Sequence, residues 1–394
     1  MFSSKFSSKL LDRRLGRLAA TAGAMILALI VAACDGAADE PAADEPAGAE
    51  PSEAAEEPTA DETDPTEGIP DEELLDAAVA EGQVTWYTAI PTEASTAVAE
   101  AFMDEYPDIE AEVLRLPSFQ LWERFRTEAA AGRNVADVIS FSDWGVQKSA
   151  MAFDLVTPYV PPGIEENVPA EFIDPLEGYG WINRITTVGF VYNTDAVPDE
   201  YVPSDWTDLL DPWWGENDRL AIGDPAESAA IYAAFWSMAR EDSIGPEFFQ
   251  GLGELDPPLY AQGGQQLNAV TAGEHAGTIV VDYRGWQLID DGAPVEIVYF
   301  PSGVGNSVDF NSVVTEAPNP NAARLFMNYL ASSEGADVLA RTLGAYLSRT
   351  DATAYPEGVG RPPIDEVPLL PLDLDAAADD YDAFNEQFDE WIGR

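Results

Sequence analysis

The stretch Asp282-Tyr283-Arg284-Gly285-Trp286 gathers side chains that can bind a ligand, directly after a short apolar run at residues 278–281. The Arg284 guanidinium can donate two parallel hydrogen bonds to a carboxylate, a phosphate or a phosphonate. The oxygens of Asp282 and Tyr283 are hard donors, which suit a cation such as Fe(III). These residue types therefore predict a ligand site, for either an organic anion or a metal ion.

Strand-like and helix-like patterns alternate along the chain, which predicts an α/β fold. One strand–helix–strand–helix–strand series is expected at residues 84–88, 93–106, 109–114, 121–131 and 137–141. A second series has a strand at 220–222, a helix at 229–240 and the strand at 278–281. Ligands of such sheets lie beyond the carboxyl ends of the strands. The loops that follow these strands are therefore expected to face one site.

Loops that lead from a strand into a helix supply the other candidate contacts, because free N–H groups at a helix N-terminus bind anions. The predicted ligand-binding residues are Thr88, Ile90, Thr92, Ser142, Asp143, Trp144, Glu227, Ser228, Asp282, Tyr283, Arg284 and Trp286. A metal site would instead use Asp143, Asp282 and Tyr283. Simpler roles stay open: Arg284 can pair with an acid, Trp286 can belong to the core, and Ser228 can be a plain helix cap.

The N-terminus predicts export. Five basic residues precede an apolar segment at residues 19–33 that is too short to span a bilayer comfortably. The segment ends in Val31-Ala32-Ala33-Cys34, which resembles the bacterial lipobox. Cys34 is the only cysteine, so no intramolecular disulfide can form. We expect residues 1–33 to be a lipoprotein signal peptide and Cys34 to carry a lipid that anchors the protein to the outer face of the cytoplasmic membrane.

Acidic residues dominate the rest of the chain. Residues 35–67 contain no lysine, arginine or large apolar side chain, so we expect residues 34–69 to be an extended, disordered acidic tether. From residue 68 onward there are 58 acidic and 14 basic residues, and Lys148 is the single lysine. This charge opposes binding to nucleic acid or to an anionic membrane. It also indicates adaptation to high salt, which screens the self-repulsion.

Several motifs occur together in an order that resembles the ferric-ion-binding-like branch of the extracellular solute-binding proteins, the receptors of ABC importers. The most specific is Ala317-Pro318-Asn319-Pro320-Asn321-Ala322-Ala323-Arg324-Leu325-Phe326, followed by Ser332-Ser333-Glu334-Gly335. The others are residues 188–194, Asp224-Pro225 with Ser228, Gly273-Glu274 and residues 292–295. The resemblance covers roughly residues 81–350.

The resemblance implies a two-lobed type II periplasmic-binding fold, in which each lobe is a mixed sheet flanked by helices. Lobe one would comprise residues 81–188 and 306–394, and lobe two residues 189–305. Strands that cross between the lobes are expected near residues 187–193 and 301–310. The lobes would close on a solute by hinge motion. The implied partners are a small-molecule solute and the permease subunits of an ABC importer.

The resemblance also bears on the solute. Iron-binding members place adjacent tyrosines after the strand equivalent to residues 278–281, often with a histidine from lobe one. Here Arg284 follows Tyr283, and Pro91 lies near the usual histidine. We therefore favour an anionic organic solute, such as a phosphonate, a sugar phosphate or a carboxylate. A ferric iron receptor and a ligand-presenting sensory protein are the alternatives.

Signatures of catalysis are scarce. The sequence contains no HExxH, P-loop or CxxC pattern, and the single histidine, His275, follows Gly273-Glu274 without a nucleophile motif. We therefore expect no enzymatic activity and no cofactor. We also expect a monomer that does not bind nucleic acid.

Overall fold

The structure is a computed structural model that describes residues 71–352, 355 and 358–394. The predicted signal peptide (1–33), the predicted lipidation residue Cys34 and the predicted tether (34–69) lie outside the described residues. The described residues form one sheet with the strand order β2-β1-β3-β10-β5-β8-β6-β7, flanked by helices. Across the described ranges, every helix falls short of the length and apolar character that a bilayer-spanning segment requires.

The first lobe is built on three parallel strands. The chain runs through β1 (Gln83–Thr88), α2 (Thr92–Glu105), β2 (Glu110–Arg115), α3 (Ser118–Ala130) and β3 (Val138–Phe141), and β1 pairs with both other strands. Aromatic and β-branched side chains make β1 a central strand, buried after its first residue. This series confirms the predicted order, with element ends shifted by at most three residues.

Helices from distant parts of the sequence complete the first lobe. They are α1 (Asp71–Glu81), α4 (Trp144–Ala152), α10 (Pro320–Ala331) and α11 (Ser333–Leu343). One core cluster joins Trp86 and Phe102 to Phe326, and the rings of Phe102 and Phe326 meet edge to face at 5.0 Å between centroids. The APNPNAA motif thus supplies a helix to the core of the first lobe.

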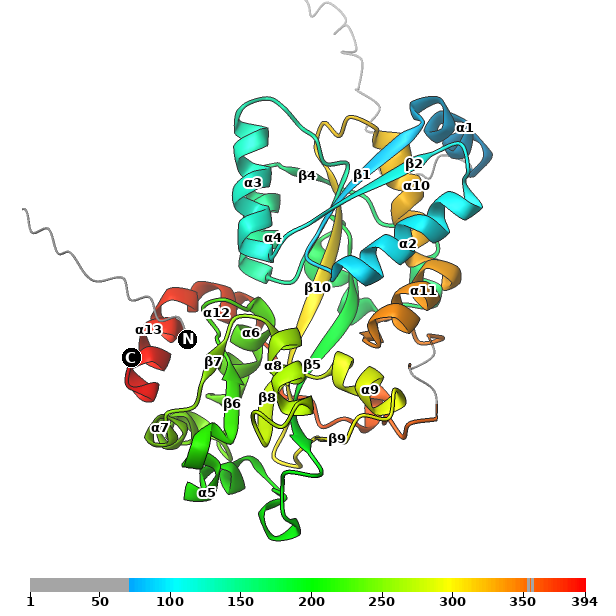
Figure 1. Ribbon diagram of the computed structural model, residues 1–394. Coiled ribbons are helices and arrows are strands. Elements are labelled where there is room, and N and C mark those ends of the chain that lie inside the picture. Colours follow the sequence, from blue (N-terminus) through cyan, green and yellow to red (C-terminus); the bar gives the residue numbers. More distant parts are fainter. Residues whose placement is uncertain (1–70, 353–354, 356–357) are drawn as a thin grey trace, which may run out of the picture. The chain divides into compact units, whose positions relative to one another are not determined.

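Two long antiparallel strands cross between the lobes. They are β5 (Trp181–Asn193) and β10 (Gly305–Val314), and Figure 1 shows both running from the elements around β1 to those around β6. Residues 181–184 and 187–194 each have a strand-like pattern, which predicts two separate strands. The structure corrects this to a single strand, because Ile185 and Thr186 are also buried and pair with β10.

The second lobe repeats the strand–loop–helix plan. Its elements are β6 (Leu220–Gly223), α6 (Ala229–Met238), α7 (Gly245–Leu255), β7 (Leu259–Tyr260), α8 (Gly263–Thr271), β8 (Gly277–Val281), α9 (Tyr283–Asp290) and β9 (Val295–Val298). Strand β6 is parallel to β7 and β8, whereas β8 and β9 are antiparallel to β5. Short elements complete the described part: β4 (Val156–Thr157), α5 (Pro212–Gly215) and β11 (Tyr346–Leu347).

The C-terminal segment forms α12 (Leu374–Asp379) and α13 (Tyr381–Ile392). Phe388 lies 5.7 Å from Phe235 of α6 and 5.9 Å from Phe249 of α7, between ring centroids. Helix α12 instead contacts α4 of the first lobe. The lobe boundaries drawn from the sequence stay a prediction, and these contacts favour placing α13 with the second lobe.

Candidate ligand-binding site

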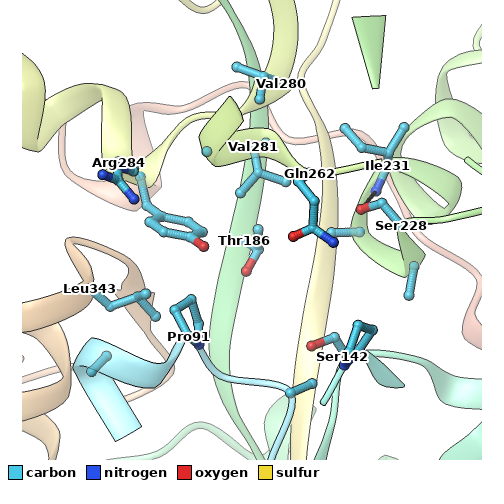
Figure 2. A pocket seen from close by; sticks show the side chains of 18 of the residues that line it. Pro91, Ser142, Thr186, Ser228, Ile231, Gln262, Val280, Val281, Arg284 and Leu343 are labelled. Atoms are coloured by element: carbon cyan, nitrogen blue, oxygen red, sulfur yellow. Dashed lines mark hydrogen bonds between the residues drawn. The ribbon is translucent and has the colours of Figure 1, made fainter. Parts of the chain in front are cut away.

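A cavity of about 380 Å³ lies where the two lobes and the crossing strands meet. Figure 2 shows Pro91 and Ser142 of the first lobe on one side, and Gln262 and Ser228 of the second lobe on the other. Thr186 of β5 lies between the two sides, at the back of the view. This volume is typical of a small-molecule site.

Five helices begin at the wall of this cavity. They are α2, α3, α6, α8 and α9, and the lining residues at their starts are Thr92, Ser118, Ser228, Gly263 and Tyr283. In α6 the Ser228 hydroxyl accepts a hydrogen bond from the Ile231 N–H at 3.4 Å. The four other helices receive no side-chain cap from the described residues that precede them, Pro91, Pro117, Gln262 and Asp282. First-turn N–H groups and the positive ends of the helix dipoles therefore converge on one space.

Three arginines line the cavity, although residues 68–394 contain only 14 basic residues. Arg115 ends β2, Arg184 lies within β5, and Arg284 lies in the first turn of α9. Arg115 and Arg284 form no ion pair with any described carboxylate. Two guanidinium groups are thus left to a ligand.

Arg184 forms a buried ion pair with Asp309 of β10. The Arg184 Nε and Nη2 atoms donate to Asp309 Oδ2 and Oδ1 at 2.8 and 2.6 Å, and the two side chains are 5% and 1% exposed. The Ser142 hydroxyl donates to Asp309 Oδ1 as well. Burial is the largest influence and lowers the pKa of Arg184, but the charge and hydrogen bonds of Asp309, together with Tyr283, raise it, and the net direction is upward, so the guanidinium stays charged.

Three buried donors at the cavity have no hydrogen-bond partner among the described residues: Arg184 Nη1, Arg115 Nε and the Thr186 hydroxyl. An unpaired buried donor costs free energy, so such groups at a cavity wall indicate a place for an acceptor on a ligand. The cavity is therefore equipped for a ligand with anionic oxygen atoms.

Tyr283 lies among these charges. The Arg184 Cζ atom is 5.9 Å from the centroid of its ring. Burial raises the pKa of the Tyr283 phenol, whereas Arg184, Arg115 and Arg284 each oppose that shift. The net direction is upward, so the phenol is protonated at neutral pH and can donate a hydrogen bond.

Six of the twelve residues predicted from the sequence line this cavity: Thr92, Ser142, Glu227, Ser228, Tyr283 and Arg284. The stretch at residues 282–286 is not a loop but the start of α9, which begins at Tyr283. Its amphipathic turn buries Gly285 and Trp286 and leaves Arg284 exposed. In Figure 2 Arg284 lies beyond Val281, on the opposite side of the cavity from Ser142.

The six other predicted residues lie elsewhere. Thr88 and Ile90 are fully buried, and the Thr88 hydroxyl accepts from the Ile90 N–H at 3.1 Å. Trp286 is buried and donates to the Tyr299 hydroxyl at 3.1 Å. Asp282, Asp143 and Trp144 are treated next, because two of them belong to the predicted metal set.

The three residues of the predicted metal alternative do not line one cavity. Tyr283 lines the large cavity, whereas Asp143, with Trp144, lines a second cavity of about 20 Å³. Asp282 lines neither cavity; it is fully buried, and its Oδ1 accepts from the Thr187 hydroxyl at 2.8 Å. Within the described ranges, no three His, Cys, Asp or Glu side chains are grouped to hold a metal ion.

Sequence reasoning missed the polar and charged residues that the strands contribute to the cavity. Arg115, Arg184, Thr186 and Asp309 lie at the ends or in the middle of strands, where we looked for core residues instead of contacts. One signal was available: Arg184 is a charged residue inside a strand that is otherwise largely apolar and fully buried. Buried charges are paired or functional, so Arg184 merited inclusion in the predicted set.

Comparison with known proteins places these features in context. A family model for bacterial extracellular solute-binding proteins matches residues 133–365, more than half of the chain. An uncharacterized protein of Haemophilus influenzae is 26% identical over 272 residues, which are 66% of this chain and 76% of that protein.

Two solved structures have the same fold. Iron-bound HitA from Pseudomonas aeruginosa gives a TM-score of 0.67 at 19% identity, over 78% of this chain and 99% of its own. AfuA from Actinobacillus pleuropneumoniae, with exogenous fructose-6-phosphate bound, gives a TM-score of 0.67 at 22% identity. The match covers 79% of this chain and 98% of the AfuA chain. These likenesses confirm the predicted two-lobed α/β periplasmic-binding fold.

Proposed function

Because the chain belongs to the family of bacterial extracellular solute-binding proteins, we propose that it captures a small anionic organic solute and delivers it to an ABC importer. The family is one of solute-binding proteins and not of enzymes. The solute class that fits best is a phosphonate, a sugar phosphate or a carboxylate. The structure of AfuA with fructose-6-phosphate shows that this fold accommodates one of these classes.

One observation carries the proposal: unpaired positive charge is concentrated in the cavity. Arg115 and Arg284 form no ion pair with a described carboxylate, and four uncapped helix N-termini meet them there. The surrounding body carries a large negative charge, which repels anions at long range. High salt reduces the range of that repulsion to a few ångströms. It weakens contacts inside a desolvated cavity much less.

Closure of the lobes would follow from where the contacts lie. Arg115 belongs to the first lobe, Arg184 to a crossing strand and Arg284 to the second lobe. An anion that engages all three favours the arrangement in which they are close together. The solute thereby shifts the population towards the closed form, which an importer can recognise.

A ferric iron receptor is the second candidate. Tyr260 and Tyr283 both line the cavity, together with the carboxylates of Glu93 and Glu227, and iron-bound HitA has the same fold. Burial raises the pKa of Tyr283, and the Tyr260 hydroxyl is hydrogen-bonded to His275 Nε2 at 2.7 Å. Both features work against phenolate ligands, so we prefer the anion.

Calorimetry and thermal-shift measurements on the purified protein in molar salt test the choice. The panel consists of inorganic phosphate, sugar phosphates, phosphonates, small carboxylates and ferric citrate. We expect an organic anion to raise Tm, and Arg284→Ala to weaken its binding by about 10- to 100-fold. A rise in Tm with iron alone, accompanied by a visible charge-transfer band, would establish the ferric receptor instead. A neighbouring sensor kinase gene in place of permease genes would favour sensing over import.

We further propose that Cys34 carries a lipid anchor and that the acidic surface serves growth in high salt. The lipobox-like sequence and the single lysine motivate these two ideas. Cys34→Ala should release the protein from membranes into the medium. The wild-type Tm should rise between low and molar salt, and a flat salt response would contradict the second idea.

A further inference from the structure

We propose that Arg184 is the deepest contact for the anionic group of the solute, and that Asp309 is the positioning residue that presents it. In this arrangement the Arg184 guanidinium bridges two acceptors, Asp309 on one edge and the solute on the other. The inference rests on the proposed function, because it assumes that the solute carries anionic oxygen atoms.

The first argument is the geometry of the guanidinium. Asp309 takes the edge formed by Nε and Nη2, at 2.8 and 2.6 Å. The group is planar and rigid, so fixing that edge fixes the direction of Nη1. Nη1 is buried without a partner among the described residues, and Arg184 lines the cavity. The ion pair therefore leaves one particular corner of Arg184 for another acceptor.

The second argument is the place of the pair in the fold. Arg184 and Asp309 are direct cross-strand partners on β5 and β10, and the register shifts immediately after Asp309. The Ser142 hydroxyl, from the loop after β3, donates to the same carboxylate. The pair thus lies on the strands that cross between the lobes and is also attached to the wall of the first lobe. A solute held there touches the hinge itself.

The third argument is charge. The charged groups that act on the Tyr283 phenol are Arg184, Asp309, Arg115 and Arg284, three cations and one anion. Asp309 neutralises Arg184 when the cavity is empty, so the protein tolerates a buried guanidinium without a ligand. Among the described residues, Asp309 is the one carboxylate that pairs with Arg184, so an anionic solute would take over as its counter-charge if Asp309 lost its charge. Occupation of the cavity should then stabilise the protein more than it does in the wild type.

Two variants of the full chain test the proposal, with inorganic phosphate as the probe. Arg184→Lys keeps a positive charge for Asp309 but removes the Nη1 donor, so we expect phosphate affinity to fall at least 10-fold by calorimetry. Asp309→Asn should lower the Tm of the empty protein by roughly 5–10 °C and increase the rise in Tm that saturating phosphate produces. If Asp309→Asn does not fold, Arg184→Lys alone decides.

The matched control is Asp137→Asn, the same change at another fully buried aspartate. Asp137 accepts from the Thr85 N–H at 2.7 Å and from Asn319, and it lies at the N-terminal end of β3, away from the cavity. We expect this variant to lower Tm without changing phosphate affinity or the phosphate-induced rise.

The outcomes separate this inference from the proposed function. If the wild type binds neither phosphate nor any organic anion of the panel, the proposed function fails and this inference falls with it. If the wild type binds phosphate and Arg184→Lys binds it equally well, the proposed function stands and Arg184 is a structural residue only. If saturating phosphate raises the Tm of Asp309→Asn by no more than it raises the Tm of the wild type, Asp309 is not a positioning residue.

Discussion

Two arginine–aspartate sets lie along strand β5, and their arrangements differ. Arg184 and Asp309 form a bidentate pair at the cavity. Asp282 and Arg361 lie near each other without an ion pair; Asp282 accepts from the Thr187 hydroxyl, and Arg361 donates to the carbonyls of Gly344 and Tyr355. Burial accordingly raises the pKa of Asp282 to about 6, which Arg361 only partly opposes.

The difference shows where the fold keeps a buried charge in spite of its desolvation cost. A buried pair seldom stabilises a protein more than an apolar pair of the same shape does. Pairing Arg184 is therefore best explained by its place at the ligand cavity. The Asp282 carboxyl has no such place, because it lines neither cavity. Burial raises its pKa to about 6, so this carboxylate loses its charge by taking up a proton as the pH falls.

The largest effect should come from removing only one partner of the first set. Asp309→Asn leaves a buried guanidinium uncompensated and should cost about 3–5 kcal/mol of unfolding free energy. The double change Arg184→Met with Asp309→Leu should recover most of that loss and abolish solute binding. Urea titration and calorimetry on both variants check this. A double variant as unstable as the single one would mean that the pair is held for stability.

The second set should respond to pH in a known direction. The pKa of Asp282 is raised in the folded state, so its contribution to stability is present below about pH 4 and is lost as the pH rises through about 6. Asp282→Asn should remove a cost of about 3 kcal/mol at pH 8 and little at pH 4, because a shift of one pKa unit corresponds to about 1.4 kcal/mol. Urea titrations at the two pH values measure the difference, and equal effects would contradict the assignment.

Arg361 should have a smaller effect. Its guanidinium carbon lies 3.7 Å from the centroid of the Tyr346 ring, and its Nη1 donates to the Tyr355 carbonyl at 2.8 Å. Arg361→Met keeps much of the packing and should cost about 1–2 kcal/mol. It also removes the cation beside Asp282, so the change in stability between pH 4 and pH 8 should become larger. A pH dependence like that of the wild type would show that the two residues are not coupled.

The smallest effect is expected outside both sets. Lys148 Nζ lies 2.8 Å from Asp375 Oδ1, but both side chains are exposed, at 46% and 67%. Exposed pairs contribute little and are screened by salt. Lys148→Met should leave Tm unchanged in molar salt. A clear fall in Tm in molar salt would show that the exposed Lys148–Asp375 pair stabilises the protein despite its exposure.

Much of the fold could be predicted from the sequence, because it depends on local patterns. The strand at Gln83–Thr88 is rich in β-branched and aromatic residues, and the helix at Pro320–Ala331 has apolar residues at helical spacing. Residues 282–286 are an exception, because they form the start of a helix where the sequence predicts a loop. Their polar and aromatic residues are typical of a loop, but burial of Gly285 and Trp286 favours a helix. Tertiary packing decided that segment.

The site was harder to predict, since it depends on contacts between distant residues. Ser228, Tyr283 and Arg284 stand at strand ends and could be found by position. Arg184 and Asp309 are 125 residues apart and meet only through the pairing of β5 with β10. Asp282 has the residue type of a ligand contact, yet it faces Thr187 inside the protein. Residue type alone does not give the direction of a side chain.

The placement of α13 has a consequence for the order of folding. Phe384, Phe388 and Ile392 belong to the same core cluster as Trp206, Phe235 and Phe249 of the second lobe. The three side chains of α13 are synthesised long after α6 and α7, which they cover, so the second lobe cannot complete its core before α13 has been made. Until then Phe235 and Phe249 lack the Phe388 ring that packs against both of them.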